Sequence, residues 1–176
     1  AMLEFVPANQ AYEIVTQRGF RTFIKSNGQV YECFRVNNAQ KQSLHVEKHD
    51  VTIKEYLEAL DLTIQVTYFT LPEAPISGFL RKVSIDFGPK APSSIELIDG
   101  LTHILPAKLD AGLLNNMSHT LRSWMVSVPT RDTMFYKLSA SIGDTAEVQM
   151  IDDVNTYQTF GLDQMSYVYD VSVIFD

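Results

Sequence analysis

The sequence contains little cysteine and no long apolar run. Cys33 is its only cysteine among 176 residues, which excludes an internal disulfide framework and a zinc site built from cysteines. No stretch of about 18 apolar residues occurs, so the sequence predicts no transmembrane helix. Residues 1–10 lack the basic start and apolar stretch of a signal peptide. We therefore expect a cytoplasmic protein.

Basic residues are fewer than acidic ones. The chain carries 14 Lys and Arg against 21 Asp and Glu, a formal net charge of −7, and its basic residues are scattered rather than clustered. A protein that binds the phosphate backbone normally presents a basic face. We therefore expect neither nucleic acid nor a membrane as a partner, and we interpret the acidity as favouring solubility.

Motifs of metal-dependent and nucleophilic enzymes are also lacking. His45 and His49 are four residues apart, but Glu47 lies midway between them, whereas a zincin helix has its glutamate next to the first histidine. Asp152 and Asp153 do not belong to an EF-hand pattern. The sequence has no nucleophile elbow and no glycine-rich phosphate loop. We therefore expect no metal and no cofactor in this chain.

Strand-forming patterns dominate what is present. Residues 62–70 alternate apolar and polar side chains, and Asn27-Gly28 is typical of a tight hairpin turn because both residues tolerate positive φ. About a dozen strands at a spacing of about 8 to 14 residues predict one all-β domain over residues 1–176, a sandwich or barrel. The predicted strands cover 12–17, 20–25, 29–36, 44–46, 62–70, 79–87, 95–98, 101–105, 118–128, 134–142, 146–151, 157–160 and 166–176.

One segment, 52–60, has a helical pattern. Thr52 and Glu55 are spaced as a capping box. Four apolar residues share one helical face: Ile53, Tyr56, Leu57 and Leu60. A strand bent by a bulge is the competing interpretation. Residues 109–116 are expected to form a helical turn or a loop.

Aromatic residues make up 11% of the chain. Tyr and Trp side chains on a β domain can stack on sugar rings, whose C–H groups meet the aromatic face while the hydroxyls bond to polar neighbours. The alternative is that these side chains fill the core of the β domain. The available residues are Tyr12, Tyr31, Trp124, Tyr136, Tyr157, Tyr167 and Tyr169.

Three stretches carry a family resemblance. The first contains the triplet 99–101 (Asp-Gly-Leu) followed by Leu105-Pro106, the second ends in Trp124-Met125, and the third covers 135–144. In this spacing the chain resembles, over residues 18–160, the N-terminal β-sandwich of cellobiose phosphorylase-like proteins, which are related to glycoside hydrolase family 94. The resemblance implies an antiparallel supersandwich of the galactose-mutarotase-like kind with little helix.

The resemblance also implies a function. In that family the sandwich precedes an (α/α)6 barrel that carries catalysis, and 176 residues leave no room for it. We therefore expect a fragment: a non-catalytic domain of a glycoside phosphorylase or glycosidase, which supports its downstream catalytic domain, contacts carbohydrate and takes part in a homodimer. The candidate carbohydrate contacts are Trp124, Tyr136, Asp99 and His103.

Two alternatives remain. One is a stand-alone carbohydrate-binding module with an aromatic platform. The other is a small mutarotase-like enzyme, which would need a histidine and a glutamate that converge in a cleft. His103 and Glu96 are close in sequence and are the candidates for such a pair.

Overall fold

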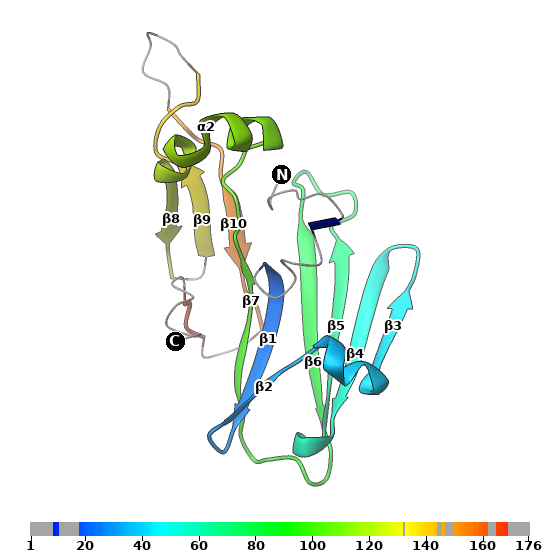
Figure 1. Cartoon of the computed structure of the whole chain (residues 1–176). Coiled ribbons are helices and arrows are strands. Elements are labelled where there is room, and N and C mark those ends of the chain that lie inside the picture. The colour runs from blue at the N-terminus through cyan, green and yellow to red at the C-terminus, as the bar shows by residue number, and fades with distance from the viewer. Residues whose placement is uncertain are drawn as a thin grey trace. The chain divides into compact units, whose positions relative to one another are not determined.

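The computed structural model describes residues 9–10, 18–131, 133–143, 146, 150–161 and 165–168. The chain divides into two compact units, of which unit 2 comprises residues 20–100 and unit 1 comprises residues 1–19 and 101–176. Antiparallel strands make up most of the regular structure, which confirms the β-rich class (Figure 1). Ten strands occur within the described residues, against the dozen or so predicted.

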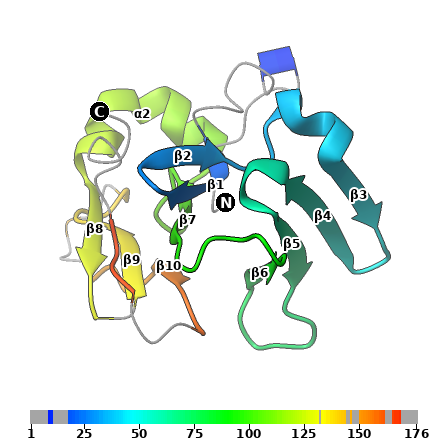
Figure 2. The ribbon, with the colours of Figure 1, turned by 90° about the horizontal axis from the view of Figure 1, so that it is seen from below.

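Unit 2 contains two sheets. The larger has the order β3-β4-β5-β6, built from β3 (Gln42–Val46), β4 (Asp50–Leu57), β5 (Leu62–Thr70) and β6 (Phe79–Phe87), and its strands lie side by side in Figures 1 and 2. The smaller has the order β2-β1-β7, built from β1 (Gly19–Ser26), β2 (Gln29–Glu32) and β7 (Glu96–Thr102). Two short 3-10 helices, η1 (Val36–Lys41) and η2 (Glu58–Leu60), precede β3 and β5.

Alternation of side chains explains the larger sheet. In β5, Leu62, Ile64 and Val66 are buried, whereas the intervening Thr63 and Gln65 are half-buried. The predicted strands 62–70 and 79–87 are therefore confirmed with the same bounds. One apolar cluster draws on both sheets and on the segments between them: Ile24, Cys33, Leu57, Leu60, Leu62 and Ile64, with Val83 and Leu97 packed against it.

The hairpin between β1 and β2 follows the predicted turn. Asn27 and Gly28 have φ values of 50° and 77°, which suits the twist of the flanking strands. The returning strand is shorter than the predicted 29–36, because β2 ends at Glu32. The chain then turns through Phe34, whose φ of 64° lies in the left-handed region, and continues into η1.

The helix predicted over 52–60 is wrong, and the competing strand interpretation holds. β4 pairs on both sides, so that Ile53 faces Leu44 of β3 and Val66 of β5. The backbone bonds of two neighbouring strands outweigh the helical pattern, and only the last three residues, η2, form a helical turn. The burial of the side chains alternates as in a strand, since Glu55 and Leu57 are buried while Lys54 and Tyr56 are exposed.

In the part of unit 1 that the structure describes, a three-stranded antiparallel sheet, β10-β9-β8, lies with the helix α2. Its elements are α2 (Ala111–Ser123), β8 (Met125–Pro129), β9 (Thr133–Leu138) and β10 (Asn155–Gln158). Asp110 caps the helix by accepting a hydrogen bond of 2.8 Å from the backbone N–H of Leu113. The core of the unit is formed by Leu105, Leu109, Leu121 and Leu138.

The strand predicted over 118–128 is wrong in its first half. The helical turn expected at 109–116 continues as α2 to Ser123, and the strand begins only at Met125. Burying Leu121 completely against the unit 1 core favours the helix. The short predicted strands 95–98 and 101–105 are replaced by one strand, β7, which runs through Asp99 and Gly100.

Other predicted strands have mixed outcomes. The strands expected at 20–25 and 44–46 lie within β1 and β3, whereas those at 134–142 and 157–160 overlap only in part with β9, which ends at Leu138, and β10, which ends at Gln158. Those at 12–17, half of 146–151 and most of 166–176 lie outside the described residues. No described helix has the length and apolar character needed to cross a membrane. The supersandwich and the single domain over 1–176 stay predictions.

We expect Ile64→Ala to lower the free energy of unfolding by about 2–5 kcal/mol, because Ile64 is completely buried in the unit 2 core. Urea denaturation followed by circular dichroism measures the change. Leu44→Ala is the matched control: Leu44 is 63% exposed on β3, and its loss should change stability by less than about 0.5 kcal/mol. Equal losses from the two variants would contradict this core.

Candidate functional site

The four predicted carbohydrate contacts are divided between the two units. Trp124, Tyr136 and His103 belong to unit 1, and Asp99 belongs to unit 2. Trp124 packs against the unit 1 core at the end of α2, and its carbonyl accepts a hydrogen bond of 2.8 Å from the backbone N–H of Ser139. Tyr136 is half-buried at the centre of β9, and burial raises its pKa. His103 is exposed, with a φ of 61°.

Asp99 is part of a polar network between the two sheets of unit 2. Thr22 of β1 donates a 2.7 Å hydrogen bond to one Asp99 oxygen, and Arg81 of β6 forms an ion pair with the other. The Arg81 guanidinium also donates to the Thr22 hydroxyl at 2.7 Å and to the Tyr68 hydroxyl at 3.1 Å. With only 5% of the Arg81 side chain exposed, this network serves the architecture of the unit.

Two aromatic rings complete the surroundings of Arg81. Its guanidinium carbon lies 5.1 Å from the ring centroid of Phe20 and 5.5 Å from that of Tyr68. Contacts of this kind stabilise a desolvated cation by about 2 kcal/mol. Both Asp99 oxygens are engaged by protein groups, so a ligand at Asp99 would have to compete with Arg81 and Thr22.

The His103 and Glu96 pair of the mutarotase-like alternative is also divided between the units. Glu96 lies on β7 and forms an exposed ion pair with Lys25, the two atoms being 3.2 Å apart. His103 follows directly on β7 and belongs to unit 1.

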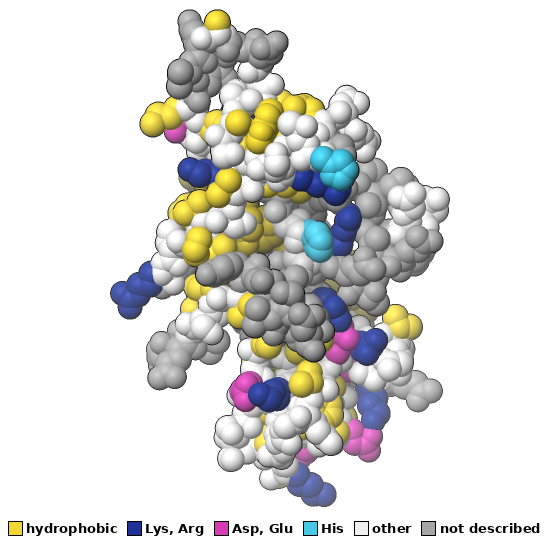
Figure 3. All heavy atoms as spheres, turned by 60° about the vertical axis from the view of Figure 1, so that its left-hand side comes forward, with side chains coloured by type: hydrophobic (Ala, Val, Ile, Leu, Met, Phe, Trp, Pro, Cys, Tyr) yellow, Lys and Arg dark blue, Asp and Glu magenta, His cyan; other side chains and the backbone are white. Residues whose placement is uncertain are grey.

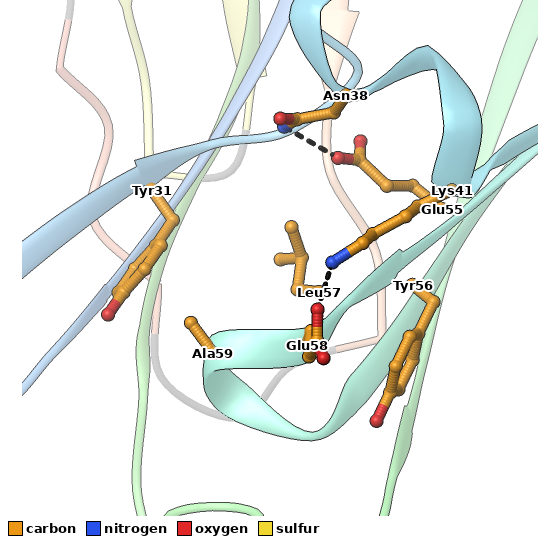
Figure 4. Close-up of a pocket in the computed structure, with 8 residues that line it drawn as sticks. All are labelled: Tyr31, Asn38, Lys41, Glu55, Tyr56, Leu57, Glu58 and Ala59. Carbon is orange, nitrogen blue, oxygen red and sulfur yellow. Dashed lines mark hydrogen bonds and ion pairs between the residues drawn. The ribbon is translucent and has the colours of Figure 1, made fainter.

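A surface pocket of about 430 Å3 lies in unit 2, between β2, η1, β4 and η2 (Figure 4). It combines two tyrosine rings with four polar or charged groups. Its lining residues are Tyr31, Asn38, Lys41, Glu55, Tyr56, Leu57, Glu58 and Ala59.

The carboxylate of Glu55 positions one wall of this pocket. Glu55 is fully buried on β4 and accepts hydrogen bonds from the backbone N–H of Phe34 and, at 2.9 Å, from the side-chain amide of Asn38. The side-chain amide of Gln42 approaches it at 3.4 Å. These donors compensate the cost of burying the carboxylate, and they fix both ends of the segment that contains η1.

The two tyrosine rings lie on opposite sides of the pocket in Figure 4. The Tyr31 hydroxyl donates to the side-chain oxygen of Gln29 at 2.6 Å, and the Tyr56 hydroxyl donates to Asp61 at 2.8 Å. The hydrogen bond to Asp61 raises the pKa of Tyr56, and bonds from the Lys90 backbone and from Tyr56 lower the pKa of Asp61. Because both hydroxyls are engaged, each ring is restrained in orientation.

An ion pair lies between the two rings in this view (Figure 4). It joins Lys41, the last residue of η1, to Glu58, the first residue of η2. The two side chains are 46% and 70% exposed. Hydrogen bonding and charge attraction from Lys41 lower the pKa of Glu58, which favours its ionised form.

Groups for metal binding or covalent catalysis are not assembled in the described part of the chain. It contains no cluster of three His, Cys, Asp or Glu residues suited to a metal ion. Cys33 is buried, and burial followed by the nearby Glu55 and Asp99 charges raises the pKa of its thiol to about 12. Such a thiol is protonated at neutral pH and is a poor nucleophile.

Sequence reasoning found the pocket only in part. Tyr31 is one of the predicted aromatic candidates, and Tyr56 was predicted to lie on a helical face. On the face of the molecule shown in Figure 3, Lys and Arg side chains are dispersed rather than gathered in a stripe. Comparisons with known protein families and with curated proteins found no match to this chain.

We expect Glu55→Ala to lower the free energy of unfolding by about 2–5 kcal/mol, because it leaves the buried donors of Phe34 and Asn38 without an acceptor. It should also speed hydrogen exchange at the Phe34 amide, measured by NMR. Glu58→Gln is the matched control, since Glu58 is exposed and touches neither donor. An unchanged Phe34 exchange rate in Glu55→Ala would contradict the assigned role.

Cys33 is expected to be nearly inert to Ellman's reagent in the folded protein at pH 8. A pKa of about 12 in place of 9.0 lowers the thiolate fraction by about 1,000-fold at this pH. The colour should appear rapidly once the chain is unfolded in guanidinium chloride. Reaction of the native chain at the rate of a free thiol would contradict the burial of Cys33.

Proposed function

We propose that this chain is a non-catalytic β domain that binds carbohydrate, and that it serves as the N-terminal sandwich domain of a glycoside phosphorylase-like or glycosidase-like protein. The observation that carries the proposal is the pocket between Tyr31 and Tyr56. Sugars are recognised by aromatic faces that meet their C–H groups and by polar groups that bond to their hydroxyls. This pocket offers both kinds of group within one unit.

The size and rim of the pocket agree with a small sugar. Its volume of about 430 Å3 lies in the lower part of the range of about 300–1,000 Å3 found for small-molecule sites. Asn38, Lys41 and Glu58 supply donors and acceptors on its rim. Because the tyrosine hydroxyls are bonded within the protein, little side-chain ordering is required on binding.

The proposed scaffold role rests on a different observation. β3 is an edge strand, and its Leu44 and Val46 are 63% and 69% exposed. An exposed apolar strand edge is normally covered by another segment or domain. The two sheets of unit 2 also share one core and the Arg81 network, which supports a sandwich for this unit.

A stand-alone carbohydrate-binding module is the second candidate function. The pocket supports the stand-alone module as well as it supports the domain of a larger protein. The exposed edge of β3 favours the domain of a larger protein. The two candidates differ in what the reading frame encodes: a barrel-coding stretch directly downstream supports the domain, and its absence supports the module.

Tyr56→Ala is expected to weaken binding of cellobiose by about tenfold, because the ring that stacks on the sugar is removed. Isothermal titration calorimetry with the full chain measures the affinity. Tyr56→Phe keeps the ring and should keep most of the binding. Phe87→Ala removes an aromatic residue that is 55% exposed and outside the pocket lining, and should leave binding unchanged.

The same calorimetric measurement is repeated with a series of common glucans and cello-oligosaccharides. The proposed function would be overturned if the wild-type chain bound none of these sugars, or if wild type and Tyr56→Ala bound them with equal affinity.

A further inference from the structure

The charges that line the pocket are unequal in number and in exposure. Two carboxylates, Glu55 and Glu58, face one ammonium group, that of Lys41. Lys41 is already paired with Glu58, and the hydrogen-bond donors that approach Glu55 are neutral groups of Phe34, Asn38 and Gln42. Among the described lining residues, the carboxyl side chains therefore outnumber the cations by one, and the cation is already paired.

The burial of Glu55 strengthens the electrostatic effect of the extra carboxyl group on a ligand in the pocket. Glu55 is fully buried, and charges in a desolvated setting are screened by salt far less than charges in solvent. Lys41 at the end of η1 forms an ion pair with Glu58 at the beginning of η2, and this pair lies between the two rings in Figure 4. A second anion that approached Lys41 would have to displace Glu58 and lie near Glu55.

An uncharged sugar meets a different situation. A hydroxyl group both donates and accepts, so one hydroxyl can accept from Lys41 while a neighbouring one donates to Glu58. Both bonds are charge-assisted and leave the ion pair in place. Specificity arises when the same groups that bond to one ligand repel another.

Resting on the proposed function, we infer that this pocket selects uncharged sugars and rejects sugars that carry phosphate or carboxylate. Glu58 is the specificity-determining residue, because it forms an ion pair with Lys41, the only cation among the described residues that line the pocket. Glu55 reinforces the discrimination from its buried position on β4.

The test compares cellobiose with glucose 6-phosphate and glucuronate by calorimetry on the full chain. Wild type should bind cellobiose at least about tenfold more tightly than either anion, a difference of about 1.4 kcal/mol. Glu58→Gln frees Lys41 and removes one negative charge, so the ratio of affinities should fall about tenfold or reverse. A charge reversal, Lys41→Glu with Glu58→Lys, restores an ion pair and should restore the preference for cellobiose.

Glu96→Gln is the matched control. It makes the same substitution in another exposed ion pair of unit 2, that with Lys25, which does not line the pocket, and it should leave the ratio unchanged. Equal binding of cellobiose and the anions, or an unchanged ratio in Glu58→Gln, would overturn the inference while the proposed function stands. Absence of binding to all three sugars would overturn both.

Discussion

The carboxylate of Glu55 is buried on a central strand and accepts hydrogen bonds from the loop that leaves β2 and enters β3. A buried carboxylate must be satisfied, and the donors that satisfy it are spread from Phe34 to Gln42. The left-handed turn at Phe34 and the position of η1 therefore depend on one acceptor. Asn38 and Lys41 reach the pocket rim from this loop, so the charge on β4 determines the geometry of the proposed site.

A second buried charge has a complementary role. Arg81 connects Asp99 and Thr22 of the smaller sheet with its own strand in the larger one, and Phe20 and Tyr68 shield its guanidinium. Unit 2 thus uses one buried carboxyl side chain to shape a surface loop and one buried guanidinium group to hold its sheets together.

The alternation of apolar and polar residues along the sequence predicted several of the strands. β5 and β6 were predicted with their observed bounds: β5 alternates buried and half-buried residues, and the two strands pair with each other along their whole length. The helix predicted over 52–60 was wrong because a capping box and a helical face coincide with a strand that pairs with β3 on one side and β5 on the other. The strand prediction was wrong over 118–123, because the helix that begins at Ala111 continues to Ser123. Its packing against Leu105 and Leu138 stabilises the helix and cannot be seen in the local sequence pattern.

The candidate site was harder to predict than the strands. Its groups come from β2, η1, β4 and η2, and their proximity is created by pairings and by the Glu55 bonds that no local pattern reveals. Aromatic content pointed to sugars in general, yet Trp124 and Tyr136 pack within unit 1, and Asp99 is bound to Arg81. The signal that would have found Tyr56 is its exposure between the buried Glu55 and Leu57, which requires the strand assignment first.

The arrangement of the smaller sheet brings the two ends of unit 2 together. β1 and β7 are the first and last strands of unit 2, and they are neighbours in the sheet. Thr22 and Asp99, 77 positions apart, are joined by a direct hydrogen bond. The point where the chain enters unit 2 therefore lies close to the point where it leaves. A unit with adjacent ends can be inserted into another sequence, or removed from it, at the cost of a single short junction.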